Sequence, residues 1–225
     1  MLGIYGIVIV FMLLSWLVSW RLKSKFKQYS EIAFRGNLTG AEVAAKMLAD
    51  NDINDVKVIS VEGQLTDHYN PLDKTVNLSA EVYHGRSVAA AAVAAHECGH
   101  AVQHAHAYMW LGLRSRMVPA LSVTSRYMQW ILLAGVLTIT VFPYLLLFGI
   151  VLFSLTTLFS FVTLPVEFDA SNRALAWLDS SGITSSQEHE MAKDALKWAA
   201  MTYVVAALAS LATLMYYVSL FLRRR

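Results

Sequence analysis

The chain has 225 residues, of which 56% are hydrophobic and only 15% are charged, and its mean hydropathy is +0.48. Soluble domains carry nearer about 25% charged residues, and so short a chain has too little interior to bury the excess, so a membrane is the expected environment. Disorder, a collagen-like chain and a disulfide scaffold are excluded, and the net charge of +2 gives no reason to expect nucleic acid as a partner.

The first element is an uncharged run from Gly3 to Trp20, which is about long enough to cross a hydrocarbon layer of roughly 30 Å. Its positive charges follow the run, beginning at Arg21, whereas a secretory signal carries them before it. We therefore expect residues 1–20 to be a retained transmembrane anchor with its N-terminus outside.

The polar segment 21–126 contains local sequence patterns that indicate secondary structure. Thr39 and Glu42 form a capping-box sequence, alternating residues indicate strands, and an alanine-rich stretch favours a helix. The predicted elements are a helix over 41–49, a strand over 56–61, a turn at 70–71, a second strand over 74–78, and a helix from Ser87 to at least His104. The second strand could be an exposed edge that accepts an extended peptide, or part of a structural hairpin.

The remaining chain is expected to supply three more membrane spans. Residues 127–165 contain no charged residue and are long enough for a hairpin of two spans, with a break at Pro143. A segment over 166–197 follows, with a helix from about Val166 to Leu178, a stop at Ser181-Gly182, and a helix capped by Ser185 and Glu188. The last span and its basic tail occupy 198–225.

A hairpin at 127–165 would place both polar segments on one side of the membrane. These segments hold 12 and 3 of the 18 basic residues, so the shared side is expected to be cytoplasmic. The three terminal arginines would then lie outside. The sequence gives no oligomeric state.

The main candidates for metal binding and catalysis lie in His96-Glu97-Cys98-Gly99-His100, an H-E-x-x-H sequence within the predicted alanine-rich helix. Residues four apart share a helix face, so His96 and His100 can bind one Zn²⁺ while Glu97 reaches a water and acts as general base. A charged glutamate in such apolar surroundings is costly to bury without a compensating cation. Cys98 is expected to be a packing residue and not a nucleophile.

A catalytic zinc needs a third protein ligand, and the sequence offers two candidate positions for it. His104 and His106 follow the motif, but position 103 is Gln103 where the metzincin pattern requires glycine. Glu167, where a span is expected to emerge, is the stronger candidate, although it could instead be an ordinary acid in the first turn of a helix. Asp169 is expected to orient a zinc histidine or to pair with Arg173.

These residues resemble those of a known family. Residues 65–71, the stretch 87–104 with the H-E-x-x-H sequence, and residues 164–171 (LPVEFDAS) are similar to the YugP-like membrane zinc metallopeptidases of bacteria. The HtpX-type and CAAX prenyl proteases of the gluzincin group are more distant relatives. The resemblance implies zinc bound by His96, His100 and Glu167, with Glu97 as general base and His68 near the site. The distant relatives usually have Asp where this chain has Ser171.

The sequence therefore predicts an α-helical membrane protein with about four transmembrane helices and a small α+β zincin-like catalytic segment. The expected activity is that of a zinc-dependent metalloendopeptidase at the cytoplasmic face of the cell membrane, acting on membrane-proximal proteins or peptides. A non-catalytic zinc-binding membrane protein, a sensor or scaffold, is the main alternative. A metal transporter is disfavoured because the later spans lack ionisable residues.

Overall fold

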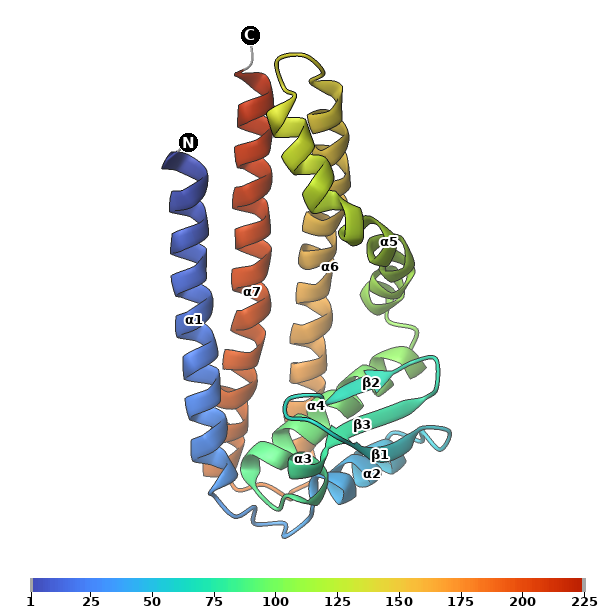
Figure 1. Ribbon diagram of the computed structural model, residues 1–225. Helices are drawn as coiled ribbons and strands as arrows, with labels where there is room; N and C mark the ends of the chain where they lie inside the picture. The colour runs from blue at the N-terminus through green and yellow to red at the C-terminus, as the bar shows by residue number, and fades with distance from the viewer. Residues whose placement is uncertain (1, 224–225) are drawn as a thin grey trace. The chain divides into compact units, whose positions relative to one another are not determined.

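The computed structural model describes residues 2–223 (Figure 1). The helices in this part of the chain are α1 (Leu2–Ser30), α2 (Gly40–Asp50), α3 (Ala80–His84), α4 (Val88–Ala105), α5 (Met109–Leu137), α6 (Tyr144–Ser180) and α7 (Ser186–Leu222). The strands are β1 (Lys57–Val61), β2 (His68–Asn70) and β3 (Thr75–Ser79). The fold is thus mostly helical, with one small sheet.

The chain forms two compact units. One contains residues 112–165 together with the beginning of α1 and the end of α7. The other contains residues 18–111 and 166–201, and it includes the whole sheet. Helices α1, α6 and α7 are long, and each contributes residues to both units.

In the first unit, α5 and α6 are consecutive helices joined by a short turn. Helix α6 begins at Tyr144, directly after Pro143, where the sequence predicts the break. Leu132 of α5 and Leu146 of α6 are buried in the same cluster, and a Cβ on Gly135 would lie 2.6 Å from the Leu146 Cα. The two backbones therefore approach closely, and glycine is needed at this contact.

Among the described residues, three helices are long and apolar enough to cross a membrane, namely α1, α6 and α7. Helix α5 is not one of them. It carries Arg114, Arg116 and Arg126, and its charge-free part after Arg126 covers only about 16 Å at ~1.5 Å per residue. The fourth span stays a prediction.

The second unit contains a mixed sheet with the strand order β1-β3-β2. Strand β3 pairs in parallel with β1 and antiparallel with β2, so both of its edges are occupied. Of the two alternatives for this strand, the open edge is therefore wrong and the structural hairpin is confirmed, because β3 pairs with His68–Asn70, which form strand β2. The strand is short since Asn70 turns the chain, with its Oδ1 accepting from the Leu72 N–H at 2.9 Å.

Helices α2 and α4 pack with the sheet around one apolar core. Its buried residues include Val43 and Met47 of α2, and Val76 and Leu78 of β3. The capping box of Thr39 and Glu42 opens α2 as predicted. Alanines on α4 let its backbone approach its neighbours, and Ser87 caps this helix by accepting from the Ala90 N–H. The predicted helices and outer strand of this segment are thereby confirmed.

Helix α6 is continuous from Tyr144 to Ser180 and passes through Pro165. The prediction that a new helix starts at Val166 is therefore wrong. Proline removes one backbone donor, but burial of Val162 and Val166 on either side favours continuation of the helix. Glu167 consequently lies in a helix interior and not in a first turn, which removes the alternative interpretation of this residue.

The ends of the later helices agree with the predictions. Helix α6 stops before Gly182, which has a φ of +67°, a conformation that glycine adopts without strain. Ser185 and Glu188 form reciprocal hydrogen bonds at the start of α7. Helix α7 then runs without interruption into the last apolar stretch.

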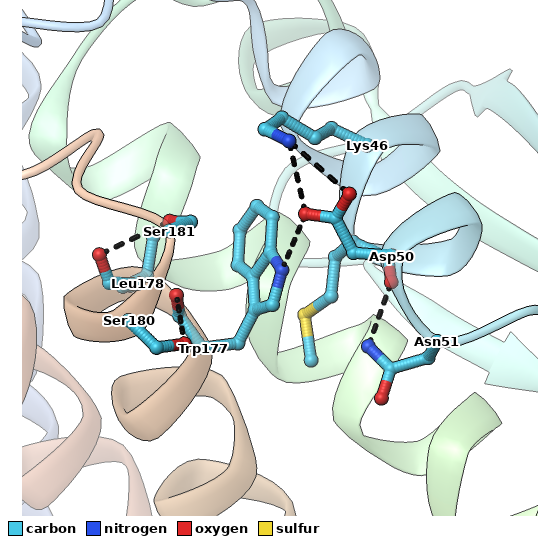
Figure 2. A network of polar contacts seen from close by, with 8 residues as sticks. Lys46, Asp50, Asn51, Trp177, Leu178, Ser180 and Ser181 are labelled. Atoms are coloured by element: carbon cyan, nitrogen blue, oxygen red, sulfur yellow. Dashed lines mark hydrogen bonds and ion pairs between the residues drawn. The ribbon is translucent and has the colours of Figure 1, made fainter.

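A polar contact attaches the end of α6 to α2 (Figure 2). The Trp177 indole N–H donates to Asp50 Oδ2 at 3.0 Å, and Lys46 Nζ lies 2.9 Å from the same oxygen. The hydrogen bonds from Lys46 and then from Trp177 lower the pKa of the Asp50 carboxyl. Since Trp177 is otherwise buried in the core, this contact helps to hold α6 in register against the second unit's core.

Helices α4 and α6 meet backbone to backbone at Gly99. A Cβ at this position would lie 2.5 Å from the Ala170 carbonyl oxygen and 3.1 Å from its Cα. The opposing atoms are backbone, so they can move only if a helix moves. Gly99 therefore sets the distance between α4 and α6.

We predict that Gly99→Ala destabilises the protein, because the added methyl group forces α6 away from α4. Overpacking of this kind costs about 1–3 kcal/mol, which should lower Tm by several degrees in detergent-solubilised protein. Gly112→Ala is the matched control, because no atom lies within 4 Å of the added Cβ. Equal melting temperatures for the two variants would contradict the close contact.

Candidate metal centre

The two histidines of the H-E-x-x-H sequence lie on one face of α4. His96 and His100 are separated by one helical turn, and their ring centroids are 4.9 Å apart at an interplanar angle of 81°. Uninterrupted helix before and after the pair fixes this spacing. The side chain of His96 is 14% exposed and that of His100 is 10% exposed, so water reaches the site only narrowly.

Glu167 of α6 completes the cluster. Its Oε2 lies 3.4 Å from His96 Nε2 and 3.8 Å from His100 Nε2, and the side chain is almost fully buried. Ligand atoms of these three residues all lie within 4.8 Å of one another. Among the described residues, this is the group of histidine and acidic side chains arranged to hold a metal ion.

The donor set and its spacing fit zinc. Two histidine nitrogens and one carboxylate oxygen are the ligands of one common class of catalytic zinc site. For tetrahedral bonds of about 2.1 Å, the ligand atoms should lie ~3.4 Å apart. The separations of 3.4 and 3.8 Å from Glu167 Oε2 are close to this value, and all three ligand atoms lie within 4.8 Å of one another.

Each histidine also has a polar partner at Nδ1, its other ring nitrogen. His96 Nδ1 lies 3.1 Å from Ser171 Oγ, and His100 Nδ1 lies 3.0 Å from Gln103 Oε1. The Gln103 amide nitrogen donates to both the Val166 carbonyl and Asp169 Oδ2 at 2.8 Å, so its oxygen must be the acceptor toward His100. His100 therefore carries its proton on Nδ1 and presents the Nε2 lone pair to the cluster.

Glu97 is not one of the three clustered residues. It is 8% exposed, and its Oε2 accepts a hydrogen bond from the Tyr69 backbone N–H in β2 at 3.0 Å. This bond joins the Glu97 carboxylate of α4 to strand β2. Glu97 is thus beside the candidate centre without being one of its ligand residues.

Asp169 and Arg173 form a supporting pair on α6. Arg173 Nε donates to Asp169 Oδ2 at 2.6 Å, the i+4 pair expected from the sequence. The same carboxylate oxygen accepts from Gln103, so its link to His100 runs through the glutamine. Arg173 Nη1 also lies 3.4 Å from His106 Nδ1, which places His106 outside the cluster.

His104 and His68, the other histidines that the sequence suggests near the site, also lie outside the cluster. His104 Nδ1 is 2.7 Å from the Tyr69 hydroxyl, so His104 contacts β2. His68 is exposed, and its Nδ1 is 2.7 Å from the Thr66 carbonyl oxygen. The structure therefore brings Glu167, and neither His104 nor His106, to the two motif histidines.

Three contacts of the centre were not predicted: those of Gln103, Ser171 and Tyr69. Gln103 and Ser171 had appeared in the sequence only as departures from the patterns of other peptidases. Their helical spacings, three residues after His100 and four after Glu167, could have indicated side chains that face the cluster. No local signal marked the Tyr69 backbone N–H.

Burial and neighbouring charges shift the pKa values of two buried groups in the motif, His100 and Cys98. Burial lowers the pKa of His100, but interaction with the Glu167 carboxylate and the charge of Glu97 outweigh this effect, and the net pKa is raised. Protons and a metal would therefore compete for His100. Burial raises the pKa of the Cys98 thiol, which keeps it protonated and excludes it as a nucleophile, as expected.

Comparisons with known proteins indicate a family for the whole chain. Residues 4–222 match the profile of a family described as "Putative neutral zinc metallopeptidase". The chain is 42% identical over 212 residues to "Putative membrane protease YugP" of Bacillus subtilis (strain 168), covering 94% of this chain and 93% of that protein. No solved structure gives a significant match. Because the profile spans nearly the whole chain, this protein belongs to that zinc metallopeptidase family.

Proposed function

We propose that this protein is a membrane-embedded, zinc-dependent metalloendopeptidase that hydrolyses peptide bonds of membrane-proximal proteins or peptides. The observation that carries the proposal is the convergence of His96, His100 and Glu167, with ligand atoms within 4.8 Å of one another. Glu97, buried beside them, supplies a group that a purely structural zinc site would not need. This feature favours catalysis over a sensor or scaffold.

Zinc, when bound by the three residues, would polarise the scissile carbonyl and increase the acidity of the attacking water. Glu97 takes a proton from the attacking water and delivers it to the leaving amine. The Tyr69 N–H holds the carboxylate in place for both transfers. Gln103 and Ser171 keep the zinc histidines oriented with Nε2 inward.

The proposal places the protein in the cell membrane as a multi-pass chain. Its parts would be the anchor at 1–20, the catalytic segment at 21–126 with a zincin-like arrangement, the hairpin at 127–165, the segment at 166–197 with the third ligand, and the last span with its tail at 198–225. The basic residues of the two polar segments support a cytoplasmic active site. The three apolar helices support attachment to the bilayer.

We predict that substitution of the two glutamates impairs different steps, turnover for Glu97 and zinc binding for Glu167. Glu97→Gln should keep zinc but lose about 10²–10⁴-fold in turnover, because the proton acceptor is removed. Glu167→Gln should lose zinc, because a charged ligand becomes a neutral amide. Metal content by mass spectrometry and cleavage of a casein substrate measure the two effects.

The exposed Glu190→Gln is the control for charge removal elsewhere, and it should retain both zinc and activity. Cleavage at the wild-type rate by Glu97→Gln would overturn its role as general base. Full zinc content in Glu167→Gln would overturn its role as ligand.

We predict that Gln103→Leu weakens zinc binding about 10–100-fold, because His100 loses the acceptor that fixes its tautomer. Leucine is close in size to glutamine, so the buried position should stay filled. Competition with a chromogenic chelator measures the zinc Kd, and the exposed Gln187→Leu is the control. Identical zinc affinities for the two variants would show that Gln103 does not act on the metal site.

We predict that a zinc chelator abolishes proteolysis and that added zinc restores it. Removal of the ion should also lower Tm. Zinc binds the folded site formed by Glu167 and the two histidines, so its binding free energy adds to the stability of the folded state. Cleavage and thermal unfolding are measured before and after dialysis against chelator. A chelator-sensitive Tm without any chelator-sensitive cleavage would favour the non-catalytic zinc protein.

A further inference from the structure

A cavity of about 390 Å³ lies apart from the candidate metal centre, in the second unit. It is open to solvent and is lined by the last turns of α1, the loop before β2, helix α3 and the first turn of α4, and its lining includes none of His96, His100 and Glu167. We propose that this cavity binds the phosphate headgroup of a membrane phospholipid. The proposal does not depend on the zinc chemistry.

Two lysines supply the charge that a phosphate requires. Lys23 and Lys27 both line the cavity from α1, one helical turn apart, and within residues 2–223 no carboxylate forms an ion pair with either. Lys25, between them, is already engaged, since its Nζ lies 2.9 Å from Asp194 and 3.2 Å from the Tyr29 hydroxyl. The helix therefore uses one lysine for its own packing and leaves two for a ligand.

The start of α4 adds to this positive potential. Ala89 and Ala90, in the first turn of the 18-residue helix, line the same cavity. The Ala90 N–H is capped by the Ser87 hydroxyl, and the Val88 N–H donates to the Ile32 carbonyl. The helix end therefore contributes its dipole, which favours a phosphate, and not a row of free donors. The cavity thus combines two full positive charges with a helix end.

Two acidic residues, Asp67 and Glu81, line the cavity together with the two lysines. The Asp67 carboxylate accepts from the Ser79 N–H at 2.7 Å and from its hydroxyl at 3.1 Å, so its hydrogen bonds are made within the protein while its negative charge remains. Glu81 is exposed and borders the cavity from α3. An acid beside two lysines matches the amine and phosphate of a zwitterionic headgroup such as phosphatidylethanolamine.

The position along α1 matches the headgroup layer of a bilayer. The charge-free run ends at Trp20, and Lys23 and Lys27 follow about 4.5 and ~10 Å further along the helix axis. Headgroups occupy roughly 5–8 Å on each side of the hydrocarbon layer, and lysine side chains reach further toward it. Leu22, about 3 Å past Trp20, also lines the cavity, where it can contact the glycerol and first acyl carbons.

The test uses the full-length protein in detergent, with lipid binding measured by native mass spectrometry. Wild-type protein should retain one phosphatidylethanolamine per chain, and Lys23→Gln with Lys27→Gln should bind it about tenfold more weakly or worse. The control removes two charges elsewhere, Lys57→Gln with Lys193→Gln, and should bind as the wild type does. Lys23→Arg with Lys27→Arg keeps the charge and should retain the lipid.

Two further probes separate the sources of the phosphate. Diacylglycerol, which lacks phosphate, should not be retained, and millimolar inorganic phosphate should not displace the phospholipid. Equal retention of phosphatidylethanolamine by the two charge-removing variants would overturn the proposal, as would equal retention of diacylglycerol. Displacement by inorganic phosphate would show a free-phosphate site in place of a lipid site. Equal helical content by circular dichroism verifies that each variant is folded.

Discussion

The structure of the second unit depends on the contact between a buried carboxylate and two imidazoles. Glu167 is almost fully buried, and an unpaired charge in such a place costs several kcal/mol. His96 and His100 face it from another helix, and a bound cation would satisfy all three groups together. This arrangement requires α4 and α6 to approach closely, which the absence of a side chain at Gly99 allows.

Other side chains keep this contact in register. Gln103 joins His100 to the α6 backbone and to Asp169, while Ser171 of α6 meets His96. These polar contacts cross between the two helices that carry the ligands, and Trp177 holds the end of α6 on α2. The same bonds that orient the histidines therefore also align the helices, so the candidate site and the local packing form one system.

Sequence reasoning was most successful where the signal was local. The capping boxes, the strand over 56–61 and the helix carrying His96 and His100 follow from spacing and residue type, and the structure contains them. It was wrong where nonlocal contacts decide the outcome. Pairing with β3 makes His68–Asn70 a strand and decides between the two alternatives for β3, which has a neighbour on each side. Helix α6 continues through Pro165, with Val162 and Val166 buried on either side of it.

The sequence by itself determined that the chain is largely apolar, that it carries an H-E-x-x-H helix, and that both histidines lie on one face, because helical periodicity is a property of neighbouring residues. Only the tertiary structure decided which acid meets them and which groups orient them. Ser171 and His96 are 75 positions apart in the chain, and Glu97 is bonded to a strand 28 positions away. Such distances depend on how helices and sheet pack, which no local pattern specifies.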